Sequence, residues 1–261
     1  MYYIRLFATY LRLGALGELE YRANFWINLF QSILELSVAL GGLAVVFSHT
    51  DNLGGWRPEE ILAVLGVYFL IGGLIRVLIR PSMVKFMEDV RQGTLDFTLT
   101  KPADSQVLVS IQRVELWRLA DVLIALPVLG TALVRLRVQL GLAEAVTFGM
   151  TMLSGGLIIY SFWLMLSTCA FWFVKVENIQ VIFQSMWQAG RWPISIYPAW
   201  LRAVLTFLVP VAFATTVPAS ALSGRITSNT LWGSMALAAA LLIVSRWFWR
   251  VGIRFYSGAS A

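Results

Sequence analysis

Apolar runs long enough to cross a membrane recur along the whole chain, and only short polar stretches separate them. A bilayer core about 30 Å thick requires about 20 mostly apolar residues in a helix. Five runs meet this requirement, and a sixth is predicted at the start of a proline-interrupted apolar stretch, residues 178–221. The predicted spans are residues 24–47, 60–79, 115–134, 146–173, 178–196 and 230–250. The pattern therefore predicts an all-α integral membrane protein with six transmembrane helices in a single domain, residues 1–261.

Two further segments are predicted to lie at the membrane surface. Residues 1–22 place Arg5, Thr9 and Arg12 at helical spacing opposite apolar side chains, which is typical of an interfacial amphipathic helix. Residues 197–221 precede the sixth span and are broken by three prolines. They favour a re-entrant outer hairpin, whose irregular backbone must be covered by protein or water.

The basic residues favour six spans over seven. With a re-entrant hairpin, 14 of the 20 Lys and Arg residues lie on the side of the two termini and 6 lie on the opposite side. Cytoplasmic loops carry an excess of Lys and Arg, so both termini are predicted to be cytoplasmic. A seven-span model would move Arg246, Arg250 and Arg254 outside and would weaken this bias.

Composition narrows the function. Only 13% of the residues are charged, against about 25% in soluble domains. The net charge of +6 is spread over short loops, so we expect no nucleic-acid partner. The single cysteine, Cys169, and the single histidine, His49, provide no metal site. The chain has neither a GxxxxGK[ST] loop nor a GxSxG motif, so no catalytic residue and no bound cofactor are predicted in it.

Two predicted spans carry polar side chains on one helical face. In the first span they follow steps of four, three and four: Asn24, Asn28, Gln31 and Glu35. In the fifth span they follow steps of four: Gln180, Gln184 and Gln188. Such groups should face another helix or water, because lipid does not solvate them. The stripes predict a translocation path or a subunit seam, and hydrogen bonding between helices remains the alternative.

The loop between spans two and three contains a short amphipathic segment, residues 82–91. It is predicted to form a helix with its apolar side at Met83, Phe86, Met87 and Val90, and its charged side at Lys85, Glu88 and Asp89. Gly93 is expected to end this helix, and Lys101 before Pro102 is expected to be extended. From composition alone, this segment would be a solvated loop.

Four stretches carry a family resemblance. They are "GELEYRANFW", "QGTLDFTLTKP", "GRWPISIYPAWLRAVLTFLVPVAFATTVPASALSG" and the C-terminal "RFYSGAS". Together they resemble the permease subunits of ABC-2 type transporters, in particular a branch of bacterial export permeases catalogued as a domain of unknown function. The second and third stretches are the more specific ones.

The resemblance implies a permease in the bacterial inner membrane that pairs with a second permease, identical or paralogous, and with two cytoplasmic ATPase subunits. ATP and Mg²⁺ would bind to the ATPases. Residues 82–91 would be the coupling helix, and spans one and five would line the seam. The residues expected to couple to the ATPase are Lys85, Phe86, Met87, Glu88, Asp89, Arg91, Gly93, Asp96 and Lys101.

The sequence therefore predicts the membrane subunit of an ATP-driven exporter. An ATP-independent transporter or channel that uses Glu35 as a proton or cation site is the alternative. A membrane scaffold without transport activity is a third class.

Overall fold

The computed structural model describes residues 2–19, 22–137, 141–173 and 177–256. Within these residues the chain is helical apart from turns, loops and one isolated bridge between Leu53 and Trp56. In the described part of the chain, five helical segments are long and apolar enough to cross a membrane, or six if one bent pair counts as a span. The all-helical class predicted from the sequence is therefore confirmed.

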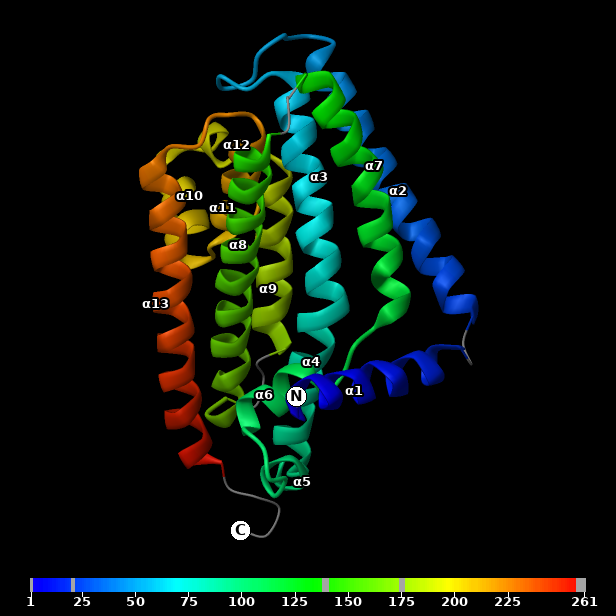
Figure 1. The fold of residues 1–261 in the computed structure, drawn as a ribbon, viewed down its shortest axis with the longest axis vertical. Helices are drawn as coiled ribbons and strands as arrows, with labels where there is room; N and C mark the ends of the chain where they lie inside the picture. Colours follow the sequence, from blue (N-terminus) through cyan, green and yellow to red (C-terminus); the bar gives the residue numbers. More distant parts are fainter. Residues whose placement is uncertain (1, 20–21, 138–140, 174–176, 257–261) are drawn as a thin grey trace.

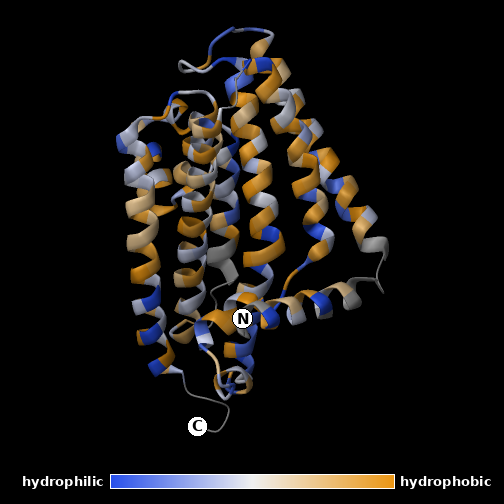
Figure 2. Cartoon of the chain, in the orientation of Figure 1, coloured by the Kyte–Doolittle hydropathy of each residue, from blue (hydrophilic) through white to orange (hydrophobic). Residues whose placement is uncertain are grey.

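Figure 1 shows long helices side by side, with connections gathered at an upper and a lower end. The helices are α1 (Tyr2–Leu19), α2 (Arg22–Phe47), α3 (Pro58–Leu74), α4 (Arg80–Gln92), α5 (Asp96–Leu99), α6 (Ser105–Ile111), α7 (Leu119–Leu136), α8 (Leu142–Thr168), α9 (Glu177–Trp187), α10 (Ala199–Ala203), α11 (Val211–Ala214), α12 (Thr216–Leu222) and α13 (Ser228–Gly252). Helix α1 lies across the lower end (Figure 1), and the middle parts of the long helices are the more hydrophobic ones (Figure 2).

Helix α3 forms the centre of the bundle. Residues 60–69 are all buried, and α7 packs along this helix. Helix α8 packs along α13, and α11 and α12 pack against α8. Burying one large apolar side chain stabilises a fold by about 1.5–3 kcal/mol. The long row of buried residues on α3 therefore makes this helix a main source of the stability of the bundle.

The second predicted span continues beyond its expected end at residue 79. Helix α3 passes through a π-helical turn, Ile75–Ile79, directly into α4. Pro81 lacks an N–H donor and lies just after this turn, so the irregular hydrogen bonding of the π-helical turn lies where the proline interrupts the regular α-helical pattern. The segment predicted as a separate helix, residues 82–91, is thus the end of a 35-residue helical run, Pro58–Gln92.

The fifth predicted span, residues 178–196, is shorter in the structure. Helix α9 ends at Trp187 and is followed by two 3₁₀ turns, Gln188–Arg191 and Ile194–Ile196. Eleven residues of α-helix rise by only about 16 Å. Pro193 lacks an N–H donor and lies between the two turns, which explains why no regular helix continues to residue 196.

The proline-rich segment lies at the upper end of the bundle (Figure 1). Its two halves, Ala199–Leu208 and Val211–Leu222, meet at an angle of 73°. Most residues of α11 and α12 are buried. Protein therefore covers the second half of this segment, whereas in the first half, Ala199–Leu208, only Leu205 is buried.

Candidate functional site

A cavity of about 210 Å³ lies between α2, α3 and α9 and contains an unusual number of arginines. We call it the arginine cavity. Its charged lining residues are Glu35, Arg76, Arg80, Arg118 and Arg191. The remaining lining residues are Tyr68, Gly72, Ile75, Trp163, Phe183, Gln184, Trp187 and Gln188. Four partly buried cations and the exposed Glu35 thus line one cavity among mostly apolar helices.

Arg76 is fixed by a buried carboxylate. It projects from the π-helical turn, and its Nε donates to Asp121 Oδ2 of α7 at 2.6 Å. Ser32 of α2 donates to the other oxygen of Asp121. Asp121 is 2% exposed, and buried polar groups need hydrogen-bond partners. This network supplies them to the Asp121 carboxylate and joins three helices at the edge of the cavity.

Arg80 and Arg118 are held less strongly. With the amide of Gln184 oriented toward Arg80, its oxygen accepts from Arg80 Nε at 3.3 Å and from Nη2 at 3.1 Å. Arg118 Nε donates to Glu115 at 3.3 Å, and its guanidinium lies 4.7 Å from the centre of the Trp117 ring. Both arginines keep donors that can reach the cavity, because a guanidinium carries five N–H groups.

Arg191 lies deeper in the bundle. Its guanidinium is 5.4 Å from the centre of the Tyr68 ring, which stacks on Trp187. Arg191 Nε is buried and has no hydrogen-bond partner. Tyr68, whose ring Arg191 contacts, lies ten residues from the start of α3 at Pro58, which corresponds to about 15 Å along the helix axis. The sequence-based topology counts Arg191 among the six basic residues on the outer side; in the structure it lies in the 3₁₀ turn Gln188–Arg191 and lines the arginine cavity.

The structure brings part of the two predicted stripes together. Glu35 from the first stripe and Gln184 and Gln188 from the second line the same cavity. Asn28 is buried outside the lining, and Gln31 is exposed. The side chains of Asn24 and Gln180 lie outside the described residues. Sequence reasoning missed the arginines as a group, although the spacing of Arg76 and Arg80 places them on one helical face.

The segment predicted to couple to an ATPase forms the lower end of the bundle. Gly93 ends α4 with φ of 70°, a left-handed conformation that glycine adopts readily, as predicted. Phe86 is fully buried and packs against Trp249 of α13 and Phe171. Met87 is also buried, whereas Lys85 is exposed.

Asp89 was predicted on the charged side of this helix, and that prediction is wrong. Asp89 is 5% exposed, and its carboxylate accepts from Lys85 Nζ at 2.6 Å and from Thr94 Oγ1 at 3.1 Å. Its backbone carbonyl accepts from the N–H of Thr94 at 2.9 Å. Asp89 follows Phe86 by three residues and shares its face, so it fixes the end of α4 instead of facing solvent.

The remaining predicted coupling residues lie at or near the surface of the lower end. Arg91 donates to Glu88 at 2.7 Å, and Lys101 donates to Tyr10 of α1 at 3.4 Å. Asp96 begins α5, a short helix that the sequence did not predict. The next residue, Phe97, is 75% exposed, and α5, which contains it, lies at the lower end of the bundle (Figure 1).

An ion pair connects this lower end to the last long helix. Arg246 of α13 donates to Asp104 Oδ1 at 2.8 Å and also to Oδ2, and it donates to Gln106 at 2.9 Å. Asp104 also caps α6 by accepting from the N–H of Val107. The hydrogen bond from Arg246 holds the pKa of Asp104 below its usual range.

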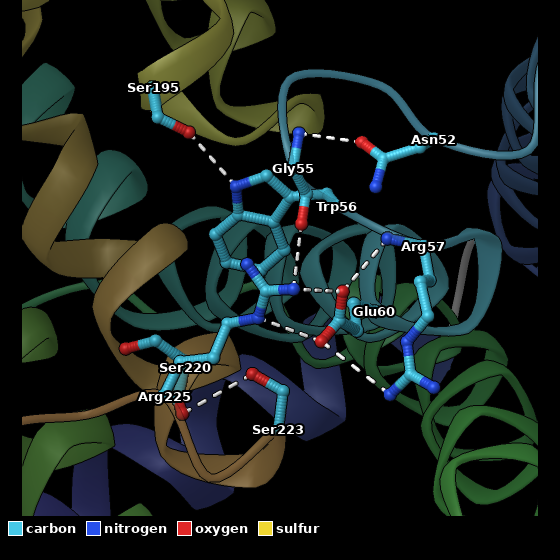
Figure 3. Close-up of polar contacts among 9 residues, drawn as sticks. All are labelled: Asn52, Gly55, Trp56, Arg57, Glu60, Ser195, Ser220, Ser223 and Arg225. Atoms are coloured by element: carbon cyan, nitrogen blue, oxygen red, sulfur yellow. Dashed lines mark hydrogen bonds and ion pairs between the residues drawn. The ribbon is translucent and has the colours of Figure 1, made fainter.

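A second polar cluster closes the upper end (Figure 3). Arg225, which precedes α13, donates to both oxygens of Glu60 at 2.7 Å and to the Gly55 carbonyl at 2.7 Å. Its guanidinium lies 4.8 Å from the centre of the Trp56 ring. Trp56 Nε1 in turn donates to Ser195 at 2.9 Å. This cluster joins the loop before α3, the segment after α9 and the start of α13.

No group of three or more His, Cys, Asp or Glu residues is placed to hold a metal ion in the part of the chain that the structure describes. The fold and the arginine cavity define a multi-pass helical membrane protein with a charged internal site. Residues 33–260 match the family described as ABC-2 family transporter protein, which covers most of the chain. The protein therefore belongs to this family and is a membrane transport permease. Neither a curated protein nor a solved structure matched it significantly.

Proposed function

We propose that this chain is the membrane subunit of an ATP-driven exporter in the bacterial inner membrane, and that the arginine cavity is part of its transport path. The observation that carries the proposal is the gathering of four arginines and Glu35 in one cavity among apolar helices. Ionisable residues within spanning helices are costly in lipid and usually mark a path for polar cargo.

The second part of the proposal concerns the partner permease. Helix α2 exposes a row of large apolar side chains, including Trp26, Phe30 and Val38. Gln31 and Glu35 are also exposed on this helix, and Glu35 lines the arginine cavity. A second permease, identical or paralogous, would cover these polar groups and close the cavity, with α2 and α9 at the seam.

Energy would come from two separate cytoplasmic ATPase subunits, which bind ATP and Mg²⁺. The lower end carries both Lys and Arg residues and Phe97, which supports a cytoplasmic docking surface there. Both termini would be cytoplasmic. Helix α4 is continuous with α3, so a push on α4 would reach Arg76 and Arg80 through the π-helical turn.

Co-purification with a Walker-motif ATPase from the native membrane tests the proposal. We expect the tagged permease to retain that ATPase and to stimulate its ATP hydrolysis in liposomes. A permease that neither retains nor stimulates the ATPase would contradict the proposal.

The alternative, a proton- or cation-driven transporter, draws support from the position of Glu35 in the cavity. It requires flux driven by a proton gradient in liposomes without an ATPase, and loss of that flux in Glu35→Gln. Under our proposal, liposomes without the ATPase show no such flux.

A further inference from the structure

Two further cavities share lining residues with the arginine cavity. One, of about 190 Å³, shares Arg80 and Arg118 with it and adds Arg113 and Glu115. The other, of about 150 Å³, shares only Arg191 with it. Its further lining residues are mainly apolar: Val38, Ala39, Gly42, Leu43, Ile61, Leu65 and Trp192. A row of arginines therefore leads from the Arg113 side to Arg191, where an apolar cavity begins.

The arginines differ in whether a carboxylate balances their charge. Arg76 pairs with Asp121, and Arg118 pairs with Glu115. Among the described side chains, no carboxylate lies within 4.0 Å of the guanidinium of Arg80 or Arg191. Arg191 also keeps a buried Nε without a hydrogen-bond partner. Arg80 and Arg191 are only partly buried, so their remaining N–H groups can donate to an anion that enters the cavity.

We propose that the arginine cavity binds an oxyanion, a phosphate or a carboxylate group, with Arg191 as its principal donor and Arg80 as a second cation. The planar guanidinium fork matches the oxygens of both groups, and charge-assisted hydrogen bonds are the strong ones. Glu35 limits the affinity through its like charge. That this anion is cargo rests on the proposed transport function; the binding itself does not.

The oxyanion could be a soluble anion or the acidic group of an amphiphile. The apolar cavity beyond Arg191 offers space for an apolar chain attached to the oxyanion. An amphiphilic oxyanion should therefore bind more tightly than a free one, because each buried CH₂ group contributes about 0.8 kcal/mol.

The test uses the full-length permease in nanodiscs of zwitterionic lipid, without an ATPase. Inorganic phosphate and dodecyl phosphate are the probes, dodecanol is the uncharged control, and the melting temperature and ligand affinity are measured. Both charged probes should raise the melting temperature, dodecyl phosphate at the lower concentration, and dodecanol should not. Protection by dodecyl phosphate alone would identify an amphiphile as the source of the oxyanion.

Three variants test the expected direction of the changes in affinity and stability. Arg191→Gln should weaken binding by about tenfold, the loss of one charge-assisted hydrogen bond of about 1.4 kcal/mol. Without a ligand, this variant should differ little in stability from the native protein, because Arg191 is partly exposed and forms no ion pair among the described residues. Glu35→Gln should strengthen binding severalfold. Arg135→Gln, at an exposed arginine outside all three cavities, should change nothing.

The proposal is overturned if neither charged probe protects the native protein, or if Arg191→Gln binds them as tightly as Arg135→Gln does. These outcomes can be distinguished from a failure of the proposed transport function. Anion binding by a permease that retains no ATPase would contradict the ATP-driven exporter alone.

Discussion

Glu60 and Arg225 lie 165 positions apart in the chain and form two hydrogen bonds of 2.7 Å at the upper end of the bundle. The Glu60 side chain is 3% exposed, whereas that of Arg225 is 39% exposed. The pair thus holds the start of α3 to the turn before α13. If one member of the pair is replaced, water can reach Arg225 but not Glu60.

This difference predicts unequal costs for the two single substitutions. Arg225→Gln leaves a buried carboxylate without its main partner and should cost about 2–4 kcal/mol of stability. Glu60→Gln leaves an arginine that water can reach and should cost about half as much. Thermal unfolding of the purified variants measures both, and Glu59→Gln in the same helical turn is the control. Equal losses in the two variants would contradict this account.

Helix α8 approaches α11 so closely that only a glycine fits at the contact. A Cβ at Gly155 would lie 2.7 Å from the Phe213 carbonyl oxygen, whereas one at Gly156 would have no neighbour within 4 Å. Gly155→Ala should therefore destabilise the protein by about 1–3 kcal/mol. Gly156→Ala should be neutral, or stabilising by up to about 1 kcal/mol, because alanine favours a helix. Similar melting temperatures for both variants would show that α11 does not pack on α8 in this way.

The Asp104–Arg246 pair predicts a dependence of stability on pH. The pKa of Asp104 is lowered in the folded protein, so its carboxylate stabilises the fold above its ordinary pKa. This contribution is lost as the pH falls through the lowered pKa. Asp104→Asn should lower stability by about 1 kcal/mol at neutral pH.

Melting curves measured between neutral and acidic pH check this prediction. The gap between the native protein and Asp104→Asn should narrow as the pH falls through the carboxylate range. Asp51→Asn in the upper loop, where Asp51 is exposed, is the control. A gap that is unchanged at low pH would contradict a charge-dependent role for Asp104.

The sequence predicts the long helices well because a run of about 20 apolar residues is a strong local signal. The sequence does not predict α5, α6 or the end of α9, because these helices are short and stop at turns that tertiary packing determines. Proline and glycine mark such places, but they do not specify whether the chain bends, turns or crosses the membrane.

The candidate site was predictable only in part. Periodicity placed Glu35 and Gln184 on the polar faces of their helices, and those faces meet in the structure. It did not reveal the arginines, because Arg118 and Arg191 belong to short 3₁₀ turns whose neighbours depend on the packing of the whole bundle. Asp89 shows the opposite failure, since a charged residue was assumed to face solvent although its helical spacing placed it beside Phe86.

The same finding changes which residues can report on an ATPase partner. Phe86 and Asp89 are buried within the chain, so neither is a suitable cross-linking position. Phe97 is exposed at the lower end, and Asn52 is exposed in the upper loop. Replacing Cys169, the only native cysteine, with serine provides a background for single cysteines at positions 97 and 52.

Disulfide-range cross-linking of these two single-cysteine variants to the ATPase that co-purifies with the chain, in inside-out membrane vesicles, tests the central claim most directly. We predict a cross-link from Phe97→Cys whose yield changes when ATP and Mg²⁺ are added, and no cross-link from Asn52→Cys. The absence of a cross-link from position 97 in a preparation that still transports, or a cross-link from position 52, would contradict the account of an ATP-driven permease coupled through α4 and α5.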